Sequence, residues 1–189
     1  YSPIYQRPIE DGADIVLHSA TKYLAGHNDV LAGVVVTDNA DLYEKLFYNL
    51  NTTGAVLSPF DSYQLIRGLK TLSLRMERST ANAQEIVAFL EQSPAVKEVL
   101  YTGRGGMISF KVADEKRIPH ILNTLKVFSF AESLGGVESL ITYPTTQTHA
   151  DIPAEVRHSY GLTDDLLRLS IGIEDARDLI EDLRQALEG

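Results

Sequence analysis

Hydrophobic residues in the first third of the chain form two nearly continuous runs, at residues 15–17 and 31–36. Such runs are typical of strands covered on both faces, as in a parallel sheet, and we expect the two strands to belong together. Asp38 or Asn39 can then cap a helix that residues 51–54 end. From Ser58-Pro59 to about residue 93 the apolar spacing is again helical, which predicts a long helical connector ending before Pro94.

The strand pattern changes beyond Pro94. Residues 107–112 alternate between apolar and polar side chains, which predicts a sheet with one buried face. Apolar residues at helical spacing predict helices over about 116–125 and 174–187. Strands and helices in this order predict a small α+β domain with an antiparallel sheet whose buried face the helices cover.

Composition sets broad limits on the function. The chain has 189 residues, 44% of them hydrophobic and 23% charged, which is typical of a globular protein with one or two cores. A net charge of −9 works against a nucleic-acid or anionic-membrane partner. The absence of cysteine fits a reducing compartment, with the cytoplasm as the default. No apolar run reaches the roughly 20 residues of a membrane helix, and the first residue, Tyr1, suggests part of a longer protein.

Lys22 stands just beyond the first apolar run, in the segment His18-Ser19-Ala20-Thr21-Lys22-Tyr23. An aldehyde cofactor needs an amine for covalent attachment and short donors for its phosphate, and ligands collect beyond the carboxyl ends of strands in α/β sheets. The pattern therefore indicates pyridoxal phosphate. Taken alone, so short a match is more often a polar loop.

The Ser-x-x-Lys spacing also fits penicillin-recognising acyl enzymes, which carry a Lys-Thr-Gly strand farther on. Here the only later Lys-Thr, Lys70-Thr71, lies in a helical pattern and lacks the glycine. That alternative is therefore rejected. His27, His149 and His158 lack the spacing of zinc ligands, so we expect no metal site.

Arg168 occupies an alternating run, Leu167-Arg168-Leu169-Ser170-Ile171. The apolar members should face the core, which directs Arg168 and Ser170 to the other side. A guanidinium offers the planar two-point grip that a carboxylate accepts. Taken alone, Arg168 is better explained as a surface charge on a half-exposed strand.

A set of further motifs extends along the whole chain in a fixed order. Its members are residues 11–23 with Gly26-His27 and Asp29-Val30, then 58–61, 67–72, 74–76, 133–140, 147–150 and 167–174. Together they resemble the Cys/Met metabolism PLP-dependent enzymes, the trans-sulfuration family of cystathionine synthases and lyases.

The resemblance implies an α/β fold, the carboxyl half of a fold-type I PLP-dependent transferase. Residues 1–68 would be the end of the large parallel-sheet domain with its connecting helix. Residues 69–189 would form the small carboxyl-terminal α+β domain with an antiparallel sheet. The missing amino-terminal half would complete the cofactor site, and the usual assembly is a homotetramer built from dimers.

The resemblance also assigns the cofactor site. Lys22 would hold pyridoxal 5'-phosphate and later move protons on the substrate. Ser19 and Thr21 would bind the cofactor's phosphate.

Four residues would contact the amino-acid substrate. Arg168 would hold its α-carboxylate, and Ser139 would assist there. Glu138 occupies a position near the substrate side chain in members that act at the γ-carbon, although a solvated carboxylate explains it equally well. Thr148, in the 147–150 motif, completes the predicted substrate site.

Residues 143–153 look most like bacterial cystathionine γ-synthases and O-acetylhomoserine sulfhydrylases, although γ-lyases carry similar runs. The implied function is a γ-replacement on an O-acylhomoserine with cysteine or sulfide, giving cystathionine or homocysteine in methionine biosynthesis and cysteine metabolism. Cystathionine β- or γ-lyase and methionine γ-lyase activities are the alternatives. A non-catalytic α+β interaction module is a further alternative, which the presence of Lys22, Ser139 and Arg168 together disfavours.

Overall fold

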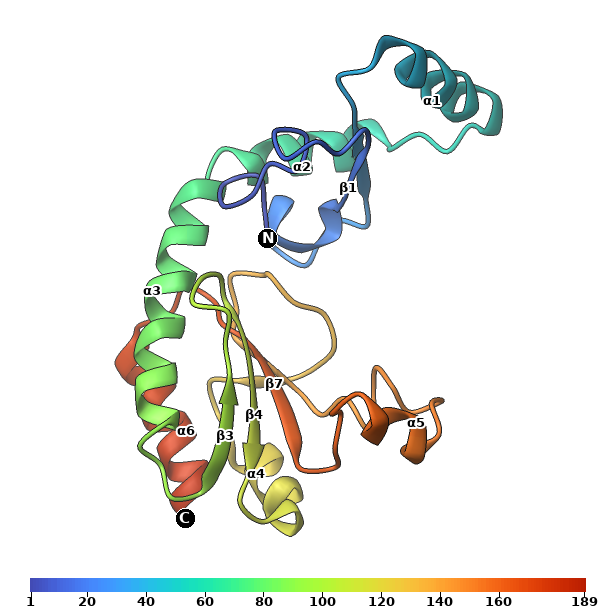
Figure 1. Ribbon diagram of the computed structural model, residues 1–189. Coiled ribbons are helices and arrows are strands. Elements are labelled where there is room, and N and C mark those ends of the chain that lie inside the picture. The colour runs from blue at the N-terminus through green and yellow to red at the C-terminus, as the bar shows by residue number, and fades with distance from the viewer. The chain divides into compact units, whose positions relative to one another are not determined.

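The computed structural model describes residues 1–189, which form two compact units, Tyr1–Ser73 and Leu74–Gly189. The first unit runs from blue to green in Figure 1 and the second from green to red. The boundary expected between residues 68 and 69 concerns the domains of the intact protein and stays a prediction.

The first unit contains a two-stranded sheet. Strand β1 (Val16–Ser19) pairs antiparallel with β2 (Gly33–Val36), with Ser19 opposite Gly33. The expectation that these two apolar runs belong together is therefore confirmed, and the two strands run antiparallel to each other. Residues 20–32 connect the two strands at the same end of the sheet. The two ends of this connection are joined, because the backbone N–H groups of Ala20 and Thr21 both donate to the carbonyl oxygen of Ala32, at 2.8 and 3.2 Å. A parallel pair would need a crossover that returns the chain to the other end of the sheet.

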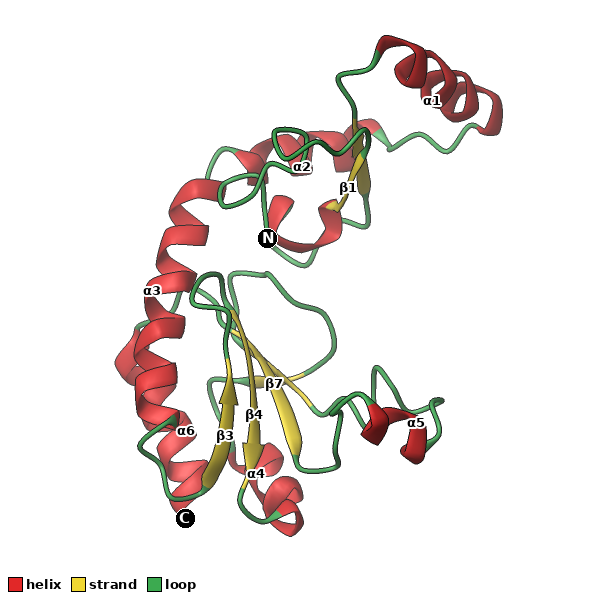
Figure 2. Cartoon of the chain, viewed as in Figure 1, coloured by secondary structure: helices red, strands yellow, loops and turns green.

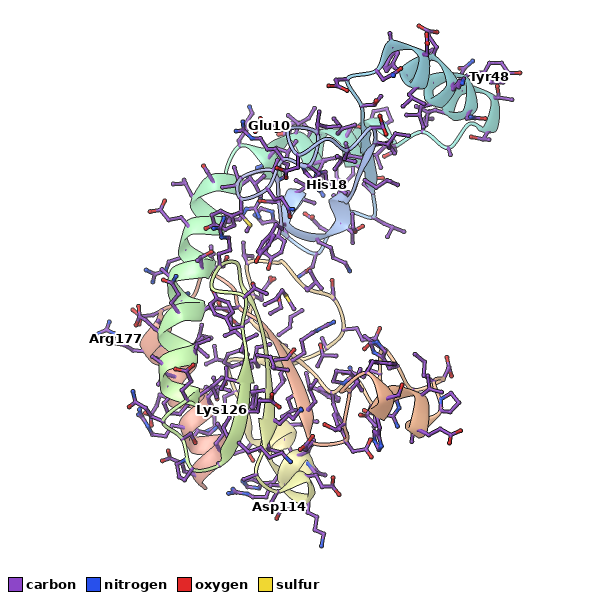
Figure 3. The ribbon with its side chains drawn as sticks, viewed as in Figure 1. Glu10, His18, Tyr48, Asp114, Lys126 and Arg177 are labelled. Carbon is purple, nitrogen blue, oxygen red and sulfur yellow. The ribbon has the colours of Figure 1, made fainter.

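Helix α1 (Ala40–Thr53) begins and ends where the sequence predicts. Asn39 caps it by accepting a hydrogen bond from the Leu42 N–H at 3.0 Å, and Gly54 ends it with a left-handed φ of 68°. None of its residues is buried within this chain. Figure 3 shows Tyr48 projecting from the helix, and 69% of that side chain is exposed.

Helix α2 (Pro59–Leu69) packs against the segment that follows β1. Ser58 caps it by accepting a hydrogen bond from the Asp61 N–H at 3.1 Å. At Gly68 the two segments touch so closely that an added Cβ would lie 2.2 Å from the Ala25 carbonyl oxygen. Because glycine has no side chain, α2 can pack directly against the segment that contains Lys22.

The second unit is built on a mixed five-stranded sheet in the order β3-β4-β7-β6-β5. Its strands are β3 (Val96–Leu100), β4 (Met107–Val112), β5 (Ser129–Phe130), β6 (Leu140–Thr142) and β7 (Leu166–Ser170). All neighbours are antiparallel except β5 and β6. The predicted antiparallel sheet is thus confirmed for its four longer strands, and the parallel pair arises because the chain crosses back through residues 131–139.

The helices of this unit also follow the predictions in part. They are α3 (Leu72–Leu90), the short 3₁₀-helix Glu115–Arg117, α4 (Ile118–Thr124), α5 (Ala154–Ser159) and α6 (Ala176–Glu188). The long helical segment predicted from residue 58 to about 93 is present as two helices, α2 and α3, which turn residues 70 and 71 separate. Helix α5 carried no pattern that predicted it.

The core of the second unit lies between the sheet and its helices. In Figure 2, α3 and α6 lie together beside β3, β4 and β7. The apolar side of β4, formed by Ile108, Phe110 and Val112, is at most 1% exposed and packs with residues of α3, α4 and α6. Each such side chain contributes roughly 1.5–3 kcal/mol on burial. No helix in the structure is long and apolar enough to cross a lipid bilayer.

Candidate functional site

The predicted cofactor lysine lies in an irregular turn. The chain leaves β1 at Ser19 and enters a short π-helix, Ala20–Leu24, which Lys22 interrupts with a φ of −88° and a ψ of −128°. Two backbone hydrogen bonds close the turn, from Ala25 to Ala20 at 3.0 Å and from Gly26 to Lys22 at 2.8 Å. Such π-type turns and unusual dihedral angles concentrate at functional sites.

The two hydroxyl groups beside the lysine differ in their surroundings. Thr21 donates to the carbonyl oxygen of Ala32 at 3.3 Å and accepts from its N–H at 3.0 Å, so this hydroxyl ties the turn to the start of β2. Ser19 is exposed, and its side chain makes no capping hydrogen bond. Ser19 can therefore offer its hydroxyl to a ligand at once, whereas Thr21 would first turn its proton away from Ala32.

Arg168 lies in the middle of β7, opposite Ser109 of β4 and Thr142 of β6. Its neighbours Leu167 and Leu169 are fully buried in the core, so the predicted alternation is confirmed. The partner on the same side as Arg168, Ser170, is nevertheless also buried, and its hydroxyl accepts from the Gly135 N–H at 2.8 Å.

The guanidinium of Arg168 is only partly satisfied by the protein. Its Nη2 donates to the Ser133 carbonyl oxygen and to the Thr142 hydroxyl, both at 3.1 Å. Its Nε is buried and has no hydrogen-bond partner. Burial lowers the pKa of Arg168 below its ordinary value, while the Glu132 carboxylate acts in the opposite direction. A buried N–H donor without a partner is costly, and a carboxylate oxygen could satisfy Nε.

Ser139 is fully buried and directly precedes β6. Its hydroxyl donates to Oε2 of Glu174 at 2.9 Å and accepts from the Gly172 N–H at 2.9 Å, and its own N–H donates to Oε1 of Glu174 at 2.6 Å. The sequence motif contains Glu174, but no pattern indicated that it would hold Ser139. The role of Ser139 at a substrate carboxylate stays a prediction.

The remaining predicted substrate residues are exposed. Glu138 directly precedes Ser139. Thr148 lies in the turns after β6, with its hydroxyl 2.7 Å from Nδ1 of His149. Glu138 and Ser139 belong to the connection between β5 and β6, which is hydrogen-bonded to β7 and the residues after it. The structure shows no hydrogen bond from Thr148 to Arg168, and the substrate roles of Glu138 and Thr148 stay predictions. No three His, Cys, Asp or Glu side chains gather closely enough to hold a metal ion.

Comparison with known proteins gives one consistent result. A family model described as Cys/Met metabolism PLP-dependent enzyme matches residues 1–188. A cystathionine γ-synthase/O-acetylhomoserine (thiol)-lyase of Bacillus subtilis is 59% identical over 187 residues, covering 99% of this chain and 50% of that protein. A cystathionine γ-lyase of the same organism is 52% identical over 203 positions, covering 99% of this chain and 54% of that protein.

Solved structures show the same similarity. A cystathionine γ-synthase from Xanthomonas oryzae pv. oryzae, crystallised in complex with aminoacrylate and cysteine, aligns with a TM-score of 0.92 and 43% identity. The alignment covers 97% of this chain and 52% of that one. The chain thus spans about half the length of the curated relatives that it matches.

Proposed function

Because this chain belongs to the Cys/Met metabolism PLP-dependent enzyme family, we propose that the intact protein is a γ-replacing transferase. The chain has the α/β fold of fold-type I PLP-dependent enzymes, and it covers about half the length of such an enzyme. In the proposed reaction the sulfur of cysteine or sulfide bonds to the γ-carbon of an O-acylhomoserine, and the acyl group leaves as a carboxylate. The product is cystathionine or homocysteine.

The observation that carries this proposal is the partly satisfied guanidinium of Arg168. An amino-acid substrate has an α-carboxylate, and the partnerless Nε of Arg168 is a buried, charged donor suited to it. Ser133 and Thr142 both accept hydrogen bonds from Nη2, so the plane of the guanidinium is fixed before a ligand arrives. Preorganised charge of this kind orients a substrate without further ordering cost.

Lys22 and Ser19 fit the cofactor that the family uses. Lys22 would hold pyridoxal 5'-phosphate through its amine, and Ser19 and Thr21 would donate hydrogen bonds to the phosphate. When bound, the cofactor supplies an electron sink for negative charge at the substrate's α- and β-carbons. The amine of Lys22 would remove protons from Cα and then Cβ, and would return them to the same carbons after the sulfur has bonded to Cγ, a role that suits a base on the irregular turn after β1.

The chain resembles both synthases and lyases, and we favour γ-replacement. The relative named as a cystathionine γ-synthase and O-acetylhomoserine (thiol)-lyase is 59% identical over 187 residues, which is 99% of this chain. The γ-lyase is 52% identical, and its alignment extends over 203 positions. This relative therefore carries residues that the present chain lacks. Lyase activity on cystathionine is the second candidate, because this relative still covers 99% of the chain.

We also propose that the intact protein, which includes the amino-terminal half, self-associates as a dimer or tetramer. Helix α1 has no buried residue, although Tyr43 and Phe47 stack on its surface with ring centroids 6.0 Å apart. More than half of each of these aromatic side chains is exposed. An apolar helix surface of this kind supports an expectation that other parts of the assembly cover it.

To test the proposal, the intact protein is first loaded with pyridoxal 5'-phosphate. It is then given O-acetyl- or O-succinylhomoserine together with either L-cysteine or sulfide. Cystathionine should form with cysteine and homocysteine with sulfide. Lys22→Ala should abolish the visible absorption band and the activity, whereas Lys116→Ala, at an exposed lysine, should change neither. Rapid breakdown of cystathionine, with no acylated homoserine consumed, would instead establish the lyase reaction.

A further inference from the structure

Residues 133–139, which we call the 133–139 loop, form most of the connection between β5 and β6. Hydrogen bonds join this loop to β7 and to the residues that follow β7. Its hydrogen bonds are Arg168 Nη2 to Ser133 O at 3.1 Å, Gly135 N to Ser170 Oγ at 2.8 Å, Ile173 N to Val137 O at 2.9 Å, and Gly172 N to Ser139 Oγ at 2.9 Å. The same loop therefore both contacts the guanidinium of Arg168 and depends on the segment after β7 for its position.

Glu174 holds the far end of this loop. Its two carboxylate oxygens accept from the N–H and the hydroxyl of Ser139, at 2.6 and 2.9 Å. Because Ser139 is fully buried, both of its donors would lose their partners without this carboxylate. Hydrogen bonds to an ionised acceptor are also stronger than neutral ones.

Glu174 is itself held by α3. The carbonyl oxygen of Glu174 accepts from Nδ2 of Asn82 at 2.9 Å, and the same nitrogen donates to the carbonyl oxygen of Gly172 at 3.2 Å. Asn82 is 1% exposed. At Gly172 an added Cβ would lie 2.1 Å from the Val137 carbonyl oxygen and 2.5 Å from Oε2 of Glu174, so the loop fits against this segment without spare room.

We propose that Glu174 is a positioning residue for substrate binding, which keeps the 133–139 loop closed on β7 and thereby presents the free Nε of Arg168 to the carboxylate of an amino acid. The inference rests on the proposed function of Arg168. Glu174 has no hydrogen bond to Arg168 and acts through Ser139 and the loop. Its loss should therefore weaken recognition of the carboxylate specifically, because the lysine segment belongs to the other compact unit.

The test compares two small amines that share the amino group and differ in the carboxylate. Glycine and methylamine are titrated separately into the intact, cofactor-loaded protein, and binding is followed by the change in visible absorption. The wild-type protein should bind glycine more tightly than methylamine. Glu174→Gln keeps the side-chain shape but offers one acceptor oxygen in place of two, so it should weaken glycine binding by about 10-fold and leave methylamine binding unchanged.

Two further variants complete the comparison. Ser139→Ala removes the hydroxyl that Glu174 holds and should reproduce the selective loss of glycine binding. The double variant should lose no more than the larger single effect, because both changes break the same link. Asp178→Asn, which removes an exposed carboxylate one turn farther along, should preserve both affinities.

The outcomes separate the inference from the proposed function. If Glu174→Gln or Ser139→Ala weakens both amines equally, or weakens neither, Glu174 does not position the carboxylate site and the inference is wrong. If the wild-type protein shows no preference for glycine over methylamine, Arg168 does not hold the carboxylate, and the proposed function fails together with the inference.

Discussion

Arg168 donates a hydrogen bond of 3.1 Å to the carbonyl oxygen of Ser133, a residue whose own φ is +92°. Only one other non-glycine residue, Asn28, has a positive φ. A side chain in this region costs of order 1–3 kcal/mol, and such strain concentrates at functional sites. The strained turn at Ser133 therefore directs a carbonyl oxygen at the guanidinium that we assign to the substrate carboxylate.

This geometry predicts that two substitutions of Ser133 change stability by different amounts. Glycine adopts a positive φ without strain but loses more entropy on folding, so Ser133→Gly should keep the free energy of unfolding within about 1 kcal/mol of wild type. A β-branched side chain is a genuine outlier at this φ, so Ser133→Val should lose about 2 kcal/mol or more. Urea unfolding of the intact protein measures both.

A matched control is available on the neighbouring strand. Ser129 in β5 is exposed and has no left-handed φ, so Ser129→Val should have little effect on stability. Equal losses for valine at positions 129 and 133 would show that the φ of Ser133 stores no strain.

Asp182 of α6 fixes the turn that leads into β5. Its carboxylate accepts from the backbone N–H groups of Lys126, Val127 and Phe128 at 2.8, 2.8 and 2.9 Å, and it is 5% exposed. Asp182→Asn would replace one acceptor oxygen with an NH₂ group facing these donors. The expected loss is about 2–4 kcal/mol in the free energy of unfolding, because buried donors are left unsatisfied.

The exposed Asp178 on the same helix supplies the control for this substitution. Asp178→Asn removes the same charge without breaking an interior contact and should change stability by less than about 0.5 kcal/mol. A similar small change for Asp182→Asn, measured by chemical unfolding of the intact protein, would contradict the role assigned to the three hydrogen bonds.

Elements with local signals were predictable from the sequence. The cap at Asn39 and the stop at Gly54 bound α1, and the alternation over 107–112 matches β4 at both ends. The antiparallel direction of β1 and β2 was not predictable, because a continuous apolar run looks the same whichever direction its partner takes. Within this chain Leu17 is 73% exposed, so the run does not report two covered faces here.

The site was predictable only in its individual residues. Arg168 carries both an alternation signal and a motif, but the groups that hold it come from separate segments, with Ser133 35 residues away and Thr142 26 residues away. Glu174 likewise meets Ser139 across 35 residues. Contacts at such separations depend on the packing of strands and loops, to which no local periodicity corresponds.

An ion pair at the edge of the sheet gives the protein a pH-dependent contribution to stability. Oδ2 of Asp165 pairs with Lys97, and its Oδ1 accepts from the Thr163 hydroxyl. Burial acts to raise the pKa of the Asp165 carboxyl, but the hydrogen bonds from Lys97 and Thr163 outweigh it. The pKa therefore lies below its ordinary value of 3.8. A carboxyl with a lowered pKa stabilises the folded state above the unfolded-state pKa, and it loses this contribution as the pH falls through the folded-state value.

Asp165→Asn should therefore lower the free energy of unfolding at neutral pH, by about 1 kcal/mol because the Lys97 side chain is 53% exposed and its attraction is screened. The difference from wild type should stay constant from pH 7 down to about 5 and shrink below about 4, as Asp165 becomes protonated in the wild-type protein. Urea unfolding of the intact protein across this range measures it. Asp151→Asn, at an exposed turn residue, should show no such trend. A difference between Asp165→Asn and wild type that grows below pH 4 would mean that the carboxyl is protonated more readily in the folded state, the reverse of the sign argued here.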